Sequence, residues 1–282
     1  MLNIISTATI SKTEVDEVTN KVIVYAIASR KFMNAKGDEQ RTNTIYKILF
    51  SPREPEIVHD LVKGARIGFE GFFTGDYQPN KNGDGFTANG PIVEANGEGV
   101  MRGFITVEAT DLTLVGPLEE KLRWSDATEV ILWGFLGRDS EFRYTPAGRP
   151  VTTGSIATNN TRYKLDEDGK PVKGEDGKAI KINQTIWWRL TIWGDRAETA
   201  SKHWNKGTAL IVWGKPQVDP ETGNPKVWQT KDGESRATYE LTVAGWAFAP
   251  ARKSGGPSDA DYQEPASNVS NSLTDGDDVI PF

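Results

Sequence analysis

The sequence predicts an all-β protein with one short helix per domain: two five-stranded barrels in tandem, followed by a disordered tail. Three observations carry this prediction. Runs of β-branched and aromatic residues alternate with turn-forming residues over positions 1–249. One helical pattern interrupts the strands in each half. The last 33 residues lack apolar periodicity, so they cannot bury enough apolar surface to offset the entropy that a chain loses when it folds.

Composition excludes several classes of protein. The chain has 282 residues, enough for two ordinary domains, and no apolar run approaches the roughly 20 residues that span a bilayer. Its start lacks the basic region and long apolar core of a signal peptide. With no cysteine and only two histidines, we expect no metal or cofactor. We also expect no enzyme, because no catalytic triad, phosphate-binding glycine loop or HExxH motif is present.

The clearest strand pattern lies in residues 121–249. Three strands, a helix and two strands follow one another there, which is the element order of the OB-fold barrel. We expect Asp195 to cap the helix N-terminus and Lys206-Gly207 to end the helix. Two long connections have the turn residues of extended hairpin arms. The expected strands are 128–137, 152–161, 184–193, 208–214 and 236–246, the helix is 195–205, and the arms are 163–183 and 215–234.

Residues 1–120 repeat this pattern weakly. A strand at 44–51, a helix at 54–63 and a strand at 64–71 have the same spacing as their counterparts in the second half. A shift of 143 residues places Lys63-Gly64 on Lys206-Gly207, Phe50 on Trp193 and Gly71 on Gly214. We therefore predict a diverged OB barrel in residues 1–120.

Charge and tryptophan are concentrated in the second predicted domain. Residues 121–249 carry 19 basic and 16 acidic side chains, whereas residues 1–120 carry 12 basic and 17 acidic ones. The same cationic segment contains all nine tryptophans. This division favours a polyanion-binding role for the second domain alone.

The strand at 184–193 predicts a binding face. Alternation places Trp187, Arg189 and Trp193 on one side of the sheet, while Trp188, Leu190 and Ile192 face the other, apolar side. An unpaired arginine is rarely buried, so the first side is expected to face solvent. An exposed indole can stack on any nucleobase, and a neighbouring cation can pair with phosphate.

Further candidates lie in and near the two arms. Trp228 is in the second arm, beyond the reach of a barrel core, and Tyr163 opens the first arm beside Arg162 and Lys164. By contrast, we expect Trp204 in the core and Trp133, Trp213 and Trp246 in the core or in an interface. The cations proposed for phosphate contact, besides Arg162 and Arg189, are Arg143, Lys164, Lys202 and Lys215.

These segments resemble the bacterial single-stranded DNA-binding proteins. EVILWGFLGRDSEFRYTPAGRPV (129–151), SIATNNTRYK (155–164), QTIWWRLTIWGDRAETASKHWNKGTALIVWG (184–214) and the terminal DDVIPF occur in that family's order. The resemblance implies OB folds and sequence-independent binding of single-stranded DNA in replication, recombination and repair. It places Trp187, Trp193 and Trp228 on the family's base-stacking positions, and a fourth on Arg162 or Tyr163, of which we prefer Tyr163.

The resemblance also implies an assembly. Trp188 replaces the family's usual histidine at a position of subunit contact, which puts the usual assembly in doubt. We expect a homo-oligomer in the cytoplasm at the nucleoid: a homodimer presenting four barrels, with a homotetramer as the alternative. The first barrel is expected to serve mainly in assembly, with modest DNA contact. Its available aromatics are Phe32, Tyr46, Phe50, Phe72, Phe73 and Tyr77.

The tail combines a linker with an acidic, apolar end. Residues 250–274 have the composition of a flexible linker, and 275–282 place three carboxylates before an apolar tip. Such a tip, with its terminal carboxylate, suits a small pocket with a basic rim on another protein. The expected partners are replication and repair proteins. The tip residues are Asp275, Asp277, Asp278, Val279, Ile280, Pro281 and Phe282.

Two other functions remain open at this point. One is an OB-fold adaptor or RNA-binding assembly protein whose tryptophans are buried in an oligomer interface. The other is a nuclease that uses clustered carboxylates and metal ions. Replacement of Trp187 separates the adaptor from the DNA-binding protein, because it would dissociate the first and weaken DNA binding by the second.

Overall fold

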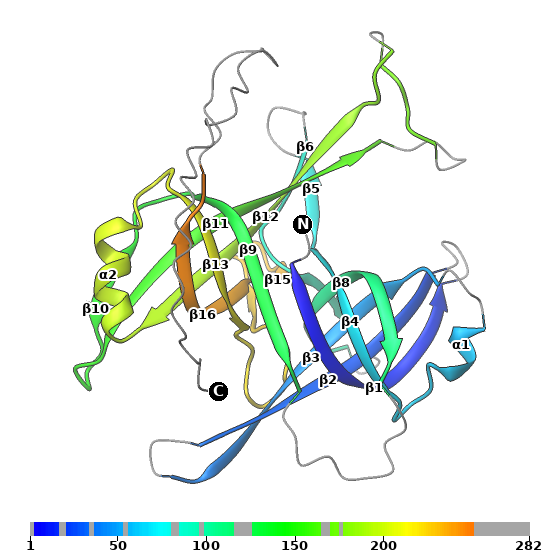
Figure 1. Ribbon diagram of the computed structural model, residues 1–282, viewed down its shortest axis with the longest axis horizontal. Coiled ribbons are helices and arrows are strands. Elements are labelled where there is room, and N and C mark those ends of the chain that lie inside the picture. Colours follow the sequence, from blue (N-terminus) through cyan, green and yellow to red (C-terminus); the bar gives the residue numbers. More distant parts are fainter. Residues whose placement is uncertain are drawn as a thin grey trace, which may run out of the picture. The chain divides into compact units, whose positions relative to one another are not determined.

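A computed structural model describes residues 3–16, 21–33, 37–52, 56–79, 85–95, 99–115, 126–164, 170–174 and 177–250. Residues Met1–Pro250 form one compact unit. The predicted linker beyond residue 250 and the whole acidic tip lie outside the described residues. Within the described residues the protein is mostly β-structure, as predicted, with the short helices α1 (Ile57–Asp60) and α2 (Asp195–His203) (Figure 1).

The first barrel closes in the strand order β1-β2-β3-β8-β4, because β1 pairs with both β2 and β4. The pairing of β3 with β8 is parallel and the others are antiparallel. Helix α1 lies between β3 and β4 in the chain, as predicted. The strands are β1 (Ile4–Asp16), β2 (Lys21–Met33), β3 (Glu39–Phe50), β4 (Arg66–Thr74) and β8 (Met101–Leu114).

The second barrel repeats this order as β9-β11-β12-β16-β13, and β9 closes it by pairing with β11 and β13. The pairing of β12 with β16 is again parallel. Helix α2 follows β12, as predicted, but its N-cap is Gly194 and Asp195 is the first helical residue, so the predicted cap is wrong. The strands are β9 (Thr128–Leu136), β11 (Pro150–Tyr163), β12 (Lys181–Trp193), β13 (Ala209–Pro216) and β16 (Tyr239–Phe248).

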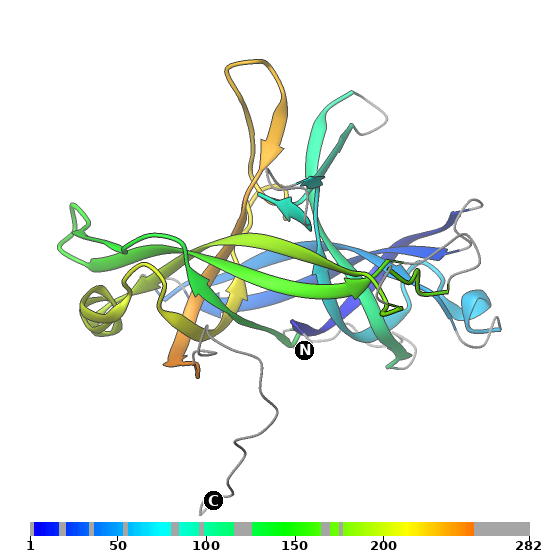
Figure 2. The same cartoon turned by 90° about the horizontal axis from the view of Figure 1, so that it is seen from above.

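Short strands outside the barrels form two projections. We call residues 75–79 and 85–95 the first arm, which is not the arm predicted at 163–183, and residues 217–238 the second arm. Figure 2 shows the second arm projecting beside the hairpin of β7 and β8. The small β10 (Glu141–Tyr144) pairs with β11. The first arm contains β5 (Tyr77–Pro79), β6 (Gly85–Ala88) and β7 (Ile92–Ala95), and the second contains β14 (Val227–Gln229) and β15 (Ser235–Ala237).

The internal repeat is confirmed in the strand order of the two barrels and at one glycine. The predicted match of Phe50 with Trp193 is wrong, because Phe50 is buried in the core and Trp193 is exposed. Gly71 and Gly214, which a shift of 143 residues superposes, both stand at a β-bulge. A Cβ on Gly71 would overlap the carbonyl oxygen of Glu108, and one on Gly214 would overlap that of Thr242. Both barrels therefore need a residue without a side chain where the fourth strand bends against the last.

An aromatic cluster joins the two barrels. The ring of Trp188, from β12, stacks on Tyr239 at 4.5 Å between centroids and packs edge-on against Phe73 of the first barrel at 4.7 Å. The Tyr239 hydroxyl donates to the Thr74 carbonyl oxygen at 2.5 Å and accepts from the Thr106 amide at 3.4 Å. Trp188, predicted on the apolar inner side of its strand at a position of subunit contact in the family, thus lies buried between two barrels of one chain.

Two strand pairings and the hydrogen bonds of Asp126 also fix the barrels to each other. Strands β1 and β9 pair antiparallel, and β6 of the first arm pairs in parallel with β12. Asp126, just before β9, accepts from the Arg66 guanidinium at 2.9 Å, the Ser29 amide at 2.7 Å and the Thr7 hydroxyl at 2.9 Å. The side chains of Arg66 and Asp126 are largely buried, so breaking their bond inside the protein would cost free energy, and the bond favours one arrangement of the barrels.

We predict that Tyr239→Phe lowers the free energy of unfolding by about 1–3 kcal/mol, because it leaves the Thr74 carbonyl and the Thr106 amide without their partner. Urea denaturation measures the change. Tyr144→Phe is the matched control, since its hydroxyl bonds Glu198 on the surface. Equal stability of the two variants would show that the buried hydroxyl does not fasten the barrels.

Candidate nucleic-acid interface

The outer face of β12 has the predicted composition. Trp188, Leu190 and Ile192 are buried with at most 1% exposure, while Arg189 and Trp193 are exposed and Trp187 is half-buried. The predicted alternation is therefore confirmed. We call the outer side of β11 and β12 the tryptophan face.

Trp193 forms one end of the tryptophan face and has two arginines near it. The Arg149 guanidinium lies 5.1 Å from the centre of the Trp193 ring, within the range of a cation–π contact. Arg143 is in line with Trp193 across the sheet, because both pair with Val151 of β11. A base stacked on Trp193 would thus have cations beside it. Arg149 was not predicted from the sequence, because only the β11–β12 register shows that it neighbours Trp193.

Trp187 is held against a glycine at the other end of the face. A Cβ on Gly137 would overlap the Trp187 ring, so the indole occupies the space that a side chain would otherwise take. The Gly137 amide donates to the Ser155 carbonyl oxygen at 2.9 Å, which fixes the loop under the ring. The orientation of Trp187 therefore depends on the absence of a side chain at position 137.

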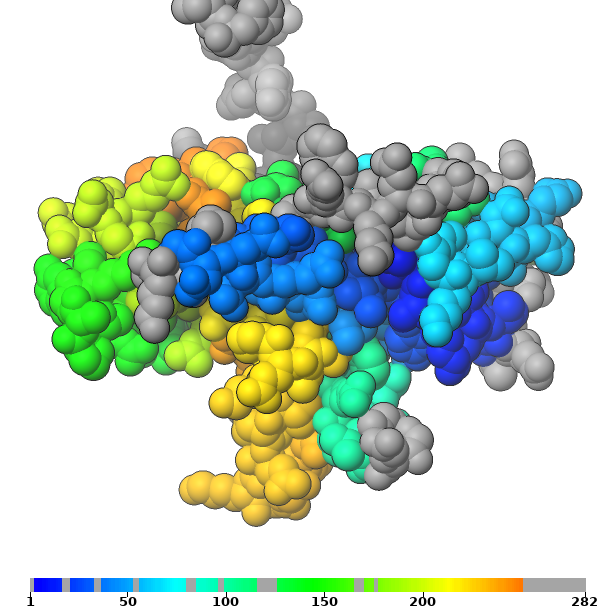
Figure 3. All heavy atoms as spheres, turned by 90° about the horizontal axis from the view of Figure 1, so that it is seen from below, coloured from blue at the N-terminus to red at the C-terminus, as the bar shows by residue number. Residues whose placement is uncertain are grey.

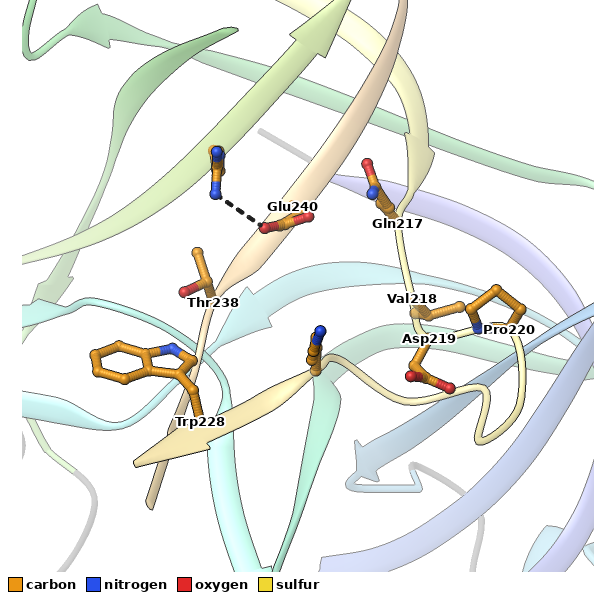
Figure 4. A pocket seen from close by; sticks show the side chains of 9 residues that line it. Gln217, Val218, Asp219, Pro220, Trp228, Thr238 and Glu240 are labelled. Carbon is orange, nitrogen blue, oxygen red and sulfur yellow. Dashed lines mark ion pairs between the residues drawn. The ribbon is translucent and has the colours of Figure 1, made fainter. Parts of the chain in front are cut away.

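Trp228 meets the tryptophan face across a cleft of about 410 Å³ (Figure 4). Trp228 and Lys226 line it from the second arm, and Arg189 and Glu240 line it from the barrel. Arg189 lies 3.7 Å from the Glu240 carboxylate, and its side chain is 51% exposed. The structure thus brings together Trp228 and Arg189, which are 39 positions apart in the sequence. Lys226 joins them although the sequence alone did not indicate it.

The candidates at the base of the arm predicted at 163–183 point in different directions. Tyr163 is 52% exposed at the end of β11, and Lys164 beside it is also exposed. The Arg162 guanidinium is ion-paired with Glu108 of the first barrel. Of the two positions considered for the fourth stacking aromatic, Tyr163 is the more exposed.

Two predicted cations lie away from the tryptophan face. Lys202 is in the last turn of α2, which packs against the inner side of β11 through the Thr152 hydroxyl. Lys215 lines a small separate cleft with Arg30 and Asp126. Lys202 and Lys215 therefore stand on other surfaces than Trp187 and Trp193, and DNA stacked on these two tryptophans would not reach both cations on the same face.

The corresponding face of the first barrel is covered by its own chain. Lys47, on the outer side of β3, is 9% exposed and is paired with Glu94 at 2.5 Å. Tyr25 on β2 packs edge-on against Phe104 at 5.7 Å. The Ile45 amide donates to the carbonyl oxygen of Gly223 in the second arm at 2.8 Å.

Three of the first barrel's expected aromatics are also unavailable. Tyr46, Phe50 and Phe73 are in the core, with at most 8% exposure, so the prediction that they offer a binding surface is wrong. The alternation of β3 and β4 turns these rings inward.

Neither a metal centre nor a membrane span is found in the described ranges. No group of three His, Cys, Asp or Glu residues there could hold a metal ion. No helix within them is long and apolar enough to cross a membrane.

Comparison with known proteins agrees with this geometry. The model of the Single-strand binding protein family matches residues 127–249, the segment of the second barrel. The second barrel is therefore a domain of this family. Single-stranded DNA-binding proteins of Xylella fastidiosa and Neisseria meningitidis are 30% identical over 128 and 115 residues. These alignments cover 45% and 41% of this chain, and 66% and 55% of the relatives' own lengths.

Solved structures extend the fold comparison to both barrels. The wild-type single-stranded DNA-binding protein of Thermus aquaticus aligns with 94% of this chain and 98% of its own, with a TM-score of 0.53 and 19% identity. A deletion mutant of the same protein aligns with 89% of this chain and 96% of its own, at the same TM-score and identity. At this identity the likeness shows the tandem fold alone.

We predict that Gly137→Ala weakens binding of oligo-dT by about 3- to 10-fold, because the added Cβ displaces the Trp187 ring and costs part of one stacking contact. Fluorescence anisotropy of a labelled oligonucleotide measures the affinity. Gly68→Ala is the control, since a Cβ there meets its nearest neighbour at an ordinary 3.4 Å. An unchanged affinity in Gly137→Ala would contradict a role for the fixed Trp187 ring.

Proposed function

We propose that this protein binds and protects single-stranded DNA, without regard to sequence, in replication, recombination and repair. One observation carries the proposal: Trp187, Arg189 and Trp193 share the outer face of one strand, and Trp228 and Lys226 stand across a cleft from it. Every nucleobase has a flat face that an indole can stack on, so such a surface binds any sequence. The match of the Single-strand binding protein family model to residues 127–249 supports the same function.

The spacing of the face fits an extended strand. Trp187 and Trp193 are six residues apart on β12, which corresponds to roughly 20 Å at about 3.3 Å per residue. Arg189 lies between them and can exchange its Glu240 partner for a phosphate. An exposed pair of this kind contributes only about 0–1 kcal/mol, so little is lost in the exchange. Replacement of counterions by these cations makes the affinity fall as salt rises.

We predict that Trp187→Ala and Trp193→Ala each weaken binding of a short oligo-dT by about 5- to 150-fold, the equivalent of about 1–3 kcal/mol for one lost stack. Anisotropy titration at low salt measures both. Phe248→Ala is the control, because Phe248 is also an exposed aromatic, at 58% against 36% for Trp193, but stands at the end of β16, outside the tryptophan face and the apolar contact proposed below. Failure of the wild-type chain to bind at low salt would refute the function.

An exposed apolar face supports self-association through a surface separate from the tryptophan face. Ile131 and Phe135 of β9, Trp213 of β13 and Ile5 of β1 are all between 37% and 56% exposed. Trp213 is paired directly with Ile131. Exposed apolar patches on soluble proteins mark contact sites, and a second copy covers such a patch isologously.

The first-barrel strand equivalent to β13 is polar at the matching position, which places most of the contact on the second barrel. The residue equivalent to Trp213 under the repeat is Glu70, and it pairs with Asp111. We therefore propose a homodimer with four barrels, formed mainly through β9 and β13. Because Trp187 and Trp193 are not part of this apolar face, dimerisation leaves them free for DNA.

Light scattering should give about 62 kDa for the wild-type protein, twice the chain mass of 31.1 kDa. Ile131→Glu should reduce the mass to that of one chain, because it places a charge in the apolar contact. Thr113→Glu, at an exposed position of the first barrel, is the control. A dimer that persists in Ile131→Glu would place the contact elsewhere.

The acidic tip completes the proposal. Its charge is opposite to that of a phosphate-binding segment, so Asp275, Asp277 and Asp278 serve a protein partner in replication or repair rather than DNA. A chain that ends at Thr274 should keep or slightly raise its affinity for oligo-dT in the same titration. Loss of DNA affinity on this truncation would contradict the assignment. The cytoplasmic nucleoid is the location that such a role requires.

A further inference from the structure

A second cleft, also of about 410 Å³, lies between the two arms, and we call it the inter-arm cleft. The first arm contributes Asp76, Gln78 and Asn89 to its wall, and the second arm contributes Trp228 and Arg236. Figure 3 shows the projection that contains the second arm beside the one that contains β7 and β8. The cleft therefore needs both barrels.

Close backbone packing fixes the walls of this cleft. A Cβ on Gly90 of the first arm would overlap the carbonyl oxygen of Ala237 in the second arm, and one on Gly103 would lie 2.9 Å from the Ala237 side chain. The Asp76 amide donates to the Gly90 carbonyl oxygen at 3.2 Å. The arms thus touch through their main chains, and the inter-arm cleft is part of the fold.

The side chains of the cleft suit a nucleotide. Trp228 is 49% exposed and offers a ring for stacking. Arg236, directly across from it on the paired strand, offers a cation. Gln78 donates to the Asp76 carboxylate at 3.1 Å, which orients the amide and leaves its oxygen as an acceptor for a base N–H. Stacking, an oriented amide and a cation together are what recognition of an unpaired nucleotide requires.

Trp228 connects this cleft with the tryptophan face, because it lines both clefts. The first barrel's own outer face is occupied by the Lys47–Glu94 pair and by the second arm. Its accessible polar groups near Trp228 are instead those of the first arm.

We infer that the inter-arm cleft is a nucleotide subsite, through which the first barrel contributes to binding by its arm. The inference rests on the proposed function and extends it. Single-stranded DNA that stacks on Trp228 can then extend from the cleft lined by Arg189 and Lys226 into the inter-arm cleft, which Arg236 and Gln78 line. A base there stacks on Trp228 and meets the amides, and its phosphate meets Arg236.

The test measures the affinity of the full-length protein for oligo-dT at several salt concentrations. Arg236→Ala should weaken binding and make the salt dependence less steep by about 0.7 in the log–log slope, the value for one phosphate contact with a single strand. Gln78→Ala combined with Asn89→Ala should weaken binding about 3- to 10-fold and leave the slope unchanged, because amides carry no charge. Circular dichroism and urea denaturation confirm that each variant is folded.

Lys12→Ala is the matched control. Lys12 is an exposed cation paired with a glutamate two residues away, as Arg236 is, but it lines neither cleft. Its removal should change neither affinity nor slope. If Trp187→Ala weakens binding while the Arg236 and amide variants match the wild type, the subsite is refuted and the proposed function stands. If the wild-type protein itself does not bind oligo-dT, both the subsite and the proposed function are refuted.

Discussion

The buried contact of Trp188 with Tyr239 and Phe73 is the constraint on which the rest of the structure depends. It takes an aromatic from β12, one from β16 and one from the first barrel, and closes them into one core. Because side chains alternate along a strand, an inward Trp188 requires an outward Trp187 and Arg189. A register slip of one residue would bury the binding face and expose this contact. The same residue that joins the barrels therefore sets the orientation of the tryptophan face.

That junction also explains why two barrels with one topology differ in use. Once β6 pairs with β12 and the second arm reaches the Ile45 amide, each barrel's arm lies on the other barrel. The outer face of β3 is covered as a result, and Lys47 is neutralised by Glu94 instead of remaining free for phosphate. The outer face of β12 remains open over most of its length. The difference in charge between the halves of the sequence follows the same division.

Features that depend on local periodicity could be predicted from the sequence. Contacts between segments far apart in the sequence could not. Strand order, the helix of each barrel and the two faces of β12 follow from alternation and from breaker residues, so the predicted 184–193 strand and the Gly71–Gly214 equivalence agree with the structure. Arg149 was missed because its proximity to Trp193 depends on pairing between strands. The buried state of Tyr46 and Phe50 was missed because the apolar pattern of β3 is irregular. Gly194 precedes α2 with a φ of 72°, which moved the helix start by one residue from the predicted cap.

The second arm sets the position of Trp228. This position affects how much single-stranded DNA one chain can contact. A barrel groove alone ends where its strands end, so a single barrel can hold only the nucleotides that cross its outer face. An aromatic on a projecting arm, anchored through Ala237 against Gly90, stands outside that limit and lies beside groups of the other barrel. Any nucleobase can stack on Trp228, so single-stranded DNA can pass from one barrel to the other without a preferred base. A tandem chain thereby gains a longer contact path from one open face and one arm, and does not require two equivalent grooves.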